Sequence, residues 1–151
     1  MNTVLLTLGR LPKALDIARS FASLGWRVIV ADPFRTHLLA ASRSVSQSVR
    51  VPAPAVDAGA YLAALAEIVD SAKVDLVVPI SEEIMFVGLL RSRLPAHVQV
   101  LAMPPEALAA AHDKYAFARH AIDIGLTAPR TALASDPEAG EIGAAGGMAR
   151  T

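Results

Sequence analysis

The chain contains no cysteine, so disulfide bonds, cysteine-ligated zinc and thiol catalysis are excluded. It also lacks an excess of either charge, because 14 basic and 14 acidic residues give a net charge of zero at pH 7. A neutral balance implies no basic face, which argues against nucleic acid or an anionic membrane as the main partner. No apolar run is long enough for a signal segment or a membrane span, since the first run, residues 4–8, ends at Gly9 and Arg10. A cytoplasmic protein that acts on small molecules is therefore expected.

The residues that are present predict an α/β domain. The chain has 151 residues, of which 54% are hydrophobic, enough for one domain with a real core. Short apolar runs predict strands at 4–8, 27–31, 48–51, 75–80 and 98–101. Helices are predicted over 12–24, 57–72, 81–94, a short stretch from Pro104, and 113–124. Strands alternating with crossover helices predict a Rossmann-like three-layer domain whose five-stranded parallel sheet has the order 3-2-1-4-5.

The loop after the first strand has few glycines. A dinucleotide site needs three glycines here so that the backbone can approach a pyrophosphate, and only Gly9 is present, followed by Arg10. A plain tight turn is the favoured interpretation, with anion binding at the following helix N-terminus as the alternative. Asp32 ends the second strand, where an acid can contact a small ligand or start a turn with Pro33.

Two acidic residues follow the fourth strand. Glu82 and Glu83 come directly after Ser81, in the first turn of a predicted helix, where the helix dipole favours negative charge. The alternative is that one of them faces the ligand crevice of the sheet, because adjacent helical residues point about 100° apart. Parallel strands one and four are adjacent in the predicted order, and their crossovers leave in opposite directions, so a gap should open between their loops. The predicted site is lined by Gly9, Arg10, Asp32, Ser81, Glu82 and Glu83, a mixture that suits a small zwitterion or hydroxy acid.

Other polar residues carry less chemistry. The histidines show no metal-ligand spacing, so surface or packing roles are expected for them and no metal site is predicted. Lys114 lies in the first turn of the last predicted helix, where a cation is mildly unfavourable. Contact with a phosphate group would explain its position, and a solvated lysine is the alternative.

In combination these segments resemble the N-terminal (pre-ATP-grasp) domain of ATP-grasp ligases of the carbamoyl-phosphate-synthase-like and biotin-carboxylase-like kind. The resemblance covers about residues 3–131. It rests on Gly9 with its helix, on the strand that ends in Asp32, and on the run from Val74 to Glu83. Asp113-Lys114, then Gly125-Leu126, and finally Pro129-Arg130-Thr131 complete the pattern, although Arg130 replaces an acidic residue common in the family.

The resemblance implies a ligase that activates a carboxylate with ATP and Mg²⁺ for attack by an amine, in which this domain forms the substrate side. It also implies that Lys114 lies near the nucleotide. Residues 1–131, including the linker helix 113–124, would form this domain, and 132–151 would be a flexible tail or the start of a missing ATP-grasp domain. That missing domain is the expected partner, a homodimer is left open, and the isolated chain should bind no cofactor well and show no turnover.

Two other functions remain open. One is a free-standing Rossmann-like domain that binds or senses a small molecule. The other is a fragment of an NAD(P)-binding reductase, against which the single glycine of the first loop speaks.

Overall fold

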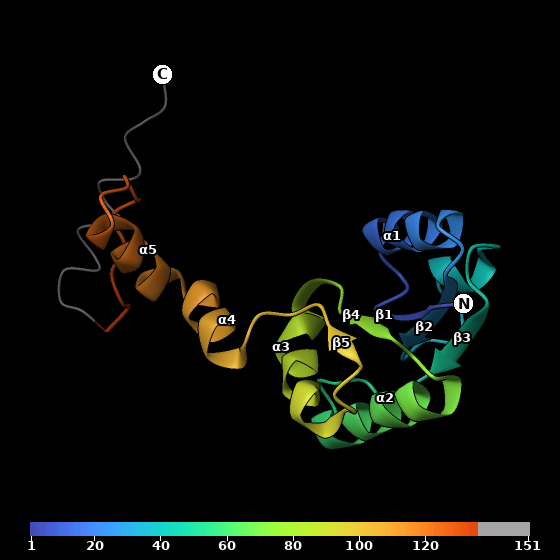
Figure 1. Ribbon diagram of the computed structural model, residues 1–151. Helices are drawn as coiled ribbons and strands as arrows, with labels where there is room; N and C mark the ends of the chain where they lie inside the picture. Colours follow the sequence, from blue (N-terminus) through green and yellow to red (C-terminus); the bar gives the residue numbers. More distant parts are fainter. Residues whose placement is uncertain (136–151) are drawn as a thin grey trace. The chain divides into compact units, whose positions relative to one another are not determined.

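The structure is a computed structural model that describes residues 1–135 (Figure 1). The chain divides into two compact units, one formed by Met1–Pro105 and the other beginning at Glu106. Each unit is described by itself. Within residues 1–135, no helix combines the length and the hydrophobicity that a membrane span requires.

The first unit contains a five-stranded parallel sheet. Its strands are β1 (Thr3–Thr7), β2 (Arg27–Asp32), β3 (Gln47–Arg50), β4 (Leu76–Val78) and β5 (Gln99–Val100). Every pairing is parallel, and the order is β3-β2-β1-β4-β5, which confirms the predicted fold class and strand order. Strands β4 and β5 are shorter than the apolar runs that predicted them.

Two long helices begin where the sequence places them. Helix α1 (Pro12–Ser23) has proline in its first turn, and α2 (Ala58–Ala72) begins after Asp57. The Asp57 carboxylate accepts a hydrogen bond of 2.8 Å from the Ala60 amide, as expected of an N-cap. A single turn of 3₁₀ helix, η1 (Leu38–Ala41), lies between β2 and β3.

The continuous helix predicted over 81–94 is wrong in detail. The segment consists of a 3₁₀ turn η2 (Ser81–Glu83), one turn of α-helix α3 (Ile84–Val87) and a second 3₁₀ segment η3 (Gly88–Arg93). After Ser81 the backbone is right-handed at Glu83, Ile84, Val87 and Gly88, but ψ is −19° at Glu83 and −28° at Val87. These values are nearer to 3₁₀ than to α geometry, so the hydrogen bonds shorten to the i→i+3 pattern.

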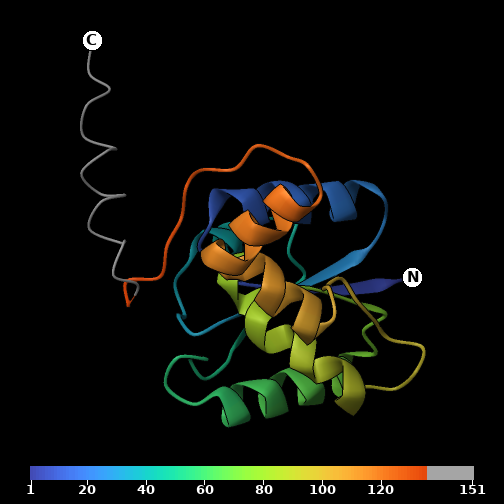
Figure 2. The same cartoon turned by 90° about the vertical axis from the view of Figure 1, so that its left-hand side faces the viewer.

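Helices cover both faces of the sheet (Figures 1 and 2). Helix α1 lies on one face, and α2 and α3 lie on the other. Alternate residues of β1 point to opposite sides: Val4 and Leu6 pack with Ala14 and Ala18 of α1, while Leu5 packs with the α2 side. The α2 residues of that second core are Tyr61, Leu62, Leu65, Ile68 and Val69.

Up to residue 135, two helices belong to the second unit. They are α4 (Pro105–His112), which begins at the boundary, and α5 (Lys114–Asp123), whose N-cap Asp113 accepts hydrogen bonds of 2.9 Å from two backbone amides. Gly125 ends α5 with a φ of +82°, a conformation that glycine adopts without strain. The tail predicted over 132–151 lies mostly outside the described residues, and the predicted boundary at residue 131 stays a prediction.

Candidate functional site

The strand ends of β1 and β4 are joined by one side chain and then separate. The Thr7 hydroxyl accepts a hydrogen bond of 3.2 Å from the Ile80 amide. Directly after this link, Leu8 and Ser81 each have a φ of +58°. Left-handed conformations of residues other than glycine cost about 1–2 kcal/mol each and gather at functional sites. The two strained residues begin the loops that follow β1 and β4, and both line the same cavity.

A cavity of about 620 Å³ lies at this edge of the sheet. Its polar lining comes from Arg10, Ser81, Glu82 and Glu83, which are four of the six predicted site residues. Apolar residues from the loops after β1, β2 and β3 complete the walls, and Phe86 comes from α3. We call this the strand-end cavity. The remaining two predicted residues, Gly9 and Asp32, lie beside it without lining it.

Asp32 holds Arg10 in place. The Asp32 side chain is fully buried, and its Oδ1 accepts hydrogen bonds from Arg10 Nη1 at 3.1 Å and from the Phe34 amide at 2.9 Å. The Arg10 guanidinium also lies over the Phe34 ring, 5.1 Å from its centroid, in a cation–π contact. Asp32 is therefore a turn former and a positioning residue, and its second oxygen, Oδ2, has no hydrogen-bond partner among residues 1–135.

Glu83 is buried and bonded to the core. It is 5% exposed, and its Oε2 accepts a hydrogen bond of 2.5 Å from the Tyr61 hydroxyl of α2. Its other oxygen, Oε1, has no hydrogen-bond partner among the described residues. Burial raises the pKa of Glu83, and the hydrogen bond from Tyr61 offsets this effect only in part. Burial and the neighbouring Glu83 also raise the pKa of Tyr61, so the phenol keeps its proton and acts as the donor.

Glu82 differs from Glu83 although both line the cavity. Its side chain is exposed and accepts a hydrogen bond of 2.5 Å from the Ser81 hydroxyl. Adjacent residues of a helical turn point in different directions, so only one of the pair is inserted against α2. The prediction that the two acids could not be equivalent is in keeping with this geometry.

Gly9 is required by packing. A Cβ atom at this position would lie 2.5 Å from Nδ1 of His37 and 2.8 Å from Cγ2 of Val30, too close for any side chain. His37 is itself fixed, since its Nδ1 accepts a hydrogen bond of 3.2 Å from the Ala40 amide and its Nε2 lies 2.9 Å from the Ser48 hydroxyl. The packing role expected of the histidines is what the structure shows for His37.

The sequence did not single out Tyr61, Thr7 or Phe34 as members of this site. Tyr61 falls on the apolar stripe of α2, where it was expected only to fill the core. A buried tyrosine hydroxyl nevertheless needs a hydrogen-bond partner, and that requirement could have indicated a polar group facing α2. Thr7 and Phe34 carry no comparable signal in the sequence.

Lys114 lies in the second unit, apart from the predicted crevice residues in sequence. Lys114 lines a cavity of about 450 Å³ with Phe117, Ala118 and Ala121 of α5, with residues 126–129 and with Thr131. Across residues 1–135 no group of three or more His, Asp or Glu side chains is arranged to hold a metal ion.

The fold occurs in solved structures of larger enzymes. An L-amino acid ligase from Bacillus licheniformis matches 85% of the chain with a TM-score of 0.67 and 16% identity. The biotin carboxylase domain of a single-chain bacterial carboxylase matches 97% of it with a TM-score of 0.67 and 24% identity. A glycinamide-RNase-transformylase T from Mycobacterium tuberculosis matches 82% with a TM-score of 0.58 and 21% identity. No protein-family model and no curated protein matches the sequence.

The chain spans only about a third of these structures, 32%, 35% and 35% of their respective lengths. At such identities the likeness is one of fold. The fold agrees with the one that the sequence resemblance implied, and the chain covers only part of the length of these enzymes.

Proposed function

We propose that this chain is the substrate-side domain of an ATP-dependent ligase that joins a carboxylate to an amine. The strand-end cavity receives a small carboxylate or amino-acid-like substrate. The observation that carries the proposal is that one cavity is lined both by the positioned guanidinium of Arg10 and by Glu83, whose Oε1 has no hydrogen-bond partner among the described residues. The shared fold with larger ATP-grasp enzymes supports the ligase class.

The cavity offers complementary groups for a zwitterion. Arg10 uses one N–H group on Asp32 and keeps other donors of its guanidinium for a substrate carboxylate. Glu83 Oε1 is an acceptor without a protein donor, so a substrate ammonium or hydroxyl would satisfy it. A bare phosphate is disfavoured, since Glu82 and Glu83 would repel it. Asp32 contributes by holding Arg10 and does not need to touch the substrate.

The proposal assigns ATP and Mg²⁺ to a partner domain. The first loop has only Gly9 where a phosphate-binding loop would need several glycines, and that glycine accommodates His37. Lys114 is proposed to contact the nucleotide when that domain is joined, on the strength of its cavity in the second unit.

The proposal is tested by titrating the ¹⁵N-labelled chain with an amino acid, acetate and methylammonium. The amino acid should shift the amides of Arg10 and residues 81–83 first, with an affinity in the millimolar range (about 4 kcal/mol), because no second domain closes over it. Acetate and methylammonium, which each carry only one of the two charged groups, should bind more weakly at the same residues. Shifts that gather at Lys114 and α5 instead would overturn the assignment.

Two variants with a matched control sharpen the test. Glu83→Gln keeps the hydrogen bond to Tyr61 but removes the charge, and should weaken binding of the amino acid and of methylammonium while leaving acetate unchanged. Arg10→Gln should weaken the binding of the amino acid and of acetate. Arg93→Gln, an exposed arginine that lines none of the described cavities, should change nothing.

The alternatives are separated by other measurements. Micromolar affinity of the isolated chain for a small molecule would favour the free-standing binding domain. Enhanced NADH fluorescence on mixing would favour the reductase fragment.

A further inference from the structure

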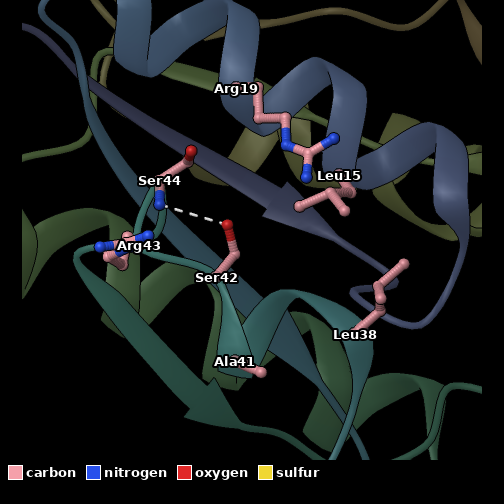
Figure 3. A pocket seen from close by; sticks show the side chains of 7 residues that line it. All are labelled: Leu15, Arg19, Leu38, Ala41, Ser42, Arg43 and Ser44. Carbon is pink, nitrogen blue, oxygen red and sulfur yellow. Dashed lines mark hydrogen bonds between the residues drawn. The ribbon is translucent and has the colours of Figure 1, made fainter.

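A second cavity lies in the first unit, between α1 and the segment that follows η1 (Figure 3). Its volume is about 400 Å³. Leu15 and Arg19 come from α1, Leu38 and Ala41 from η1, and residues 42–44 complete the lining. No residue lines both this cavity and the strand-end cavity. We call it the α1–η1 cavity.

The polar lining of the α1–η1 cavity consists of hydrogen-bond donors without an acid. It contains two arginines, Arg19 and Arg43, and two serines, Ser42 and Ser44. Arg19 pairs only with Asp16 on its own helix, at 3.7 Å, and both side chains are largely exposed. Such a pair contributes little, and Arg19 keeps further N–H groups to donate. Arg43 makes no ion pair within residues 1–135.

The loop presents its hydroxyl groups toward the same space. Ser42 Oγ accepts a hydrogen bond of 3.2 Å from the Ser44 amide, which leaves the Ser42 proton free to be donated elsewhere. In Figure 3 the hydroxyls of both serines turn toward α1, and the Arg19 side chain extends from α1 toward the loop. Arg43 extends to the other side of the loop in this view, at the rim of the cavity.

The net charge is zero, but basic and acidic residues are unevenly distributed along the chain. This distribution favours the binding of an anion at the α1–η1 cavity. Seven of the fourteen basic residues lie within residues 1–50, together with only two of the fourteen acidic residues. Residues 51–100 carry three basic and six acidic residues. The segment that builds the α1–η1 cavity is thus strongly positive, and its field attracts anionic ligands.

We propose that the α1–η1 cavity binds the oxyanion group, phosphate or carboxylate, of a small metabolite. Arg19 and the hydroxyls of Ser42 and Ser44 donate hydrogen bonds to the oxygens, and Arg43 turns in from the rim to neutralise the charge. Leu15 and Leu38 contact the apolar part of the ligand. This second site is independent of the function proposed for the strand-end cavity.

The proposal is tested by titrating the ¹⁵N-labelled chain with inorganic phosphate, with acetate and with chloride at one ionic strength. Phosphate should produce saturating shifts at the amides of Ser42 and Ser44 and at Nε of Arg19. Tighter binding of acetate at the same residues would assign the site to carboxylates. Shifts that are equal for all three ions would overturn the proposal, because they would report only charge screening.

Variants make the assignment specific. The double variant Arg19→Gln with Arg43→Gln should lower the affinity for the preferred anion at least tenfold, and Ser42→Ala with Ser44→Ala should lower it severalfold. Arg93→Gln is the control and should leave it unchanged. If the double arginine variant shows the dispersed spectrum of a folded chain and binds the anion with undiminished affinity, the proposal is wrong. Should that variant fail to fold, Arg43→Gln alone provides the same comparison, because Arg43 is exposed and forms no ion pair within residues 1–135.

Discussion

The two cavities of the first unit use charge in opposite ways. At the strand-end cavity, the carboxylates of Glu83, which lines it, and of Asp32, which lies beside it, are buried, and each accepts a hydrogen bond from a neighbouring side chain. In the α1–η1 cavity, Arg19 and Arg43 are exposed and keep their rotamer freedom. Burying a charge without full pairing destabilises the fold, whereas an exposed charge costs little. Substitutions in the first region should therefore change stability, and those in the second should change binding alone.

The largest effect is expected at Tyr61, which anchors Glu83 from the core. Tyr61→Ala should lower the free energy of unfolding by about 3–5 kcal/mol, because it leaves a cavity and removes the hydrogen bond to Glu83. Tyr61→Phe should cost about 1–3 kcal/mol, since only the hydrogen bond is lost. Urea denaturation measures both. Tyr115→Phe, whose hydroxyl has no hydrogen-bond partner among residues 1–135, is the control and should stay within about 0.5 kcal/mol.

Gly9 lies beside the strand-end cavity and accepts a hydrogen bond from Leu39 of η1. Its substitution should have the second largest effect on stability. Gly9→Ala should destabilise the chain by about 1–3 kcal/mol, because the new Cβ would press on His37 and Val30. Gly59→Ala in the first turn of α2 is the matched control. Its nearest contact is 3.4 Å away, so the higher helix propensity of alanine should stabilise the chain by up to about 1 kcal/mol. Equal thermal midpoints for the two variants would contradict the packing role of Gly9.

Glu83 should impose a pH dependence. Its pKa in the folded state is raised above the ordinary value of 4.5, so the folded chain keeps a proton that the unfolded chain has lost. Stability should then fall as the pH rises from about 4.5 to the raised pKa, by at most about 1.4 kcal/mol per pH unit, and change no further above it. Glu83→Gln removes this titration. The variant should gain stability relative to the natural chain as the pH rises through that window, and a constant difference between pH 4 and 8 would refute the prediction.

The smallest effect on stability is expected at Asp16. Asp16→Asn removes the exposed pair with Arg19 and should change the free energy of unfolding by less than about 0.5 kcal/mol. It should, however, strengthen anion binding at the α1–η1 cavity, because a competing carboxylate is gone. A large loss of stability or a loss of anion affinity would remove the contrast between the two regions.

The fold could be predicted from the sequence because its signals are local and repeated. Apolar runs such as residues 27–31 and helical stripes such as that of α2 agree with one another, and the crossover rule then fixes the strand order. The helix after β4 was harder to predict, because the difference between α and 3₁₀ geometry depends on small changes in ψ that residue types do not encode.

Only the location of the site could be predicted from the sequence. Strand ends indicate where a ligand would lie, and Arg10, Ser81, Glu82 and Glu83 do line one cavity. Which glutamate is buried depends on the contact with Tyr61, 22 positions earlier in the chain. The α1–η1 cavity could not be predicted in this way. The net charge is a sum over the whole chain, so it does not show that residues 1–50 carry an excess of basic residues.

The contact between Gly9 and His37 also bears on how sequences with this arrangement can diverge. The ring of His37 occupies the space that a side chain at position 9 would need, and the Leu39 amide donates a hydrogen bond of 3.0 Å to the Gly9 carbonyl. A larger side chain at either position can be accommodated only if the residue at the other position is smaller. Positions 9 and 37 should therefore covary among homologues, with a larger residue at the first accompanied by a smaller residue at the second.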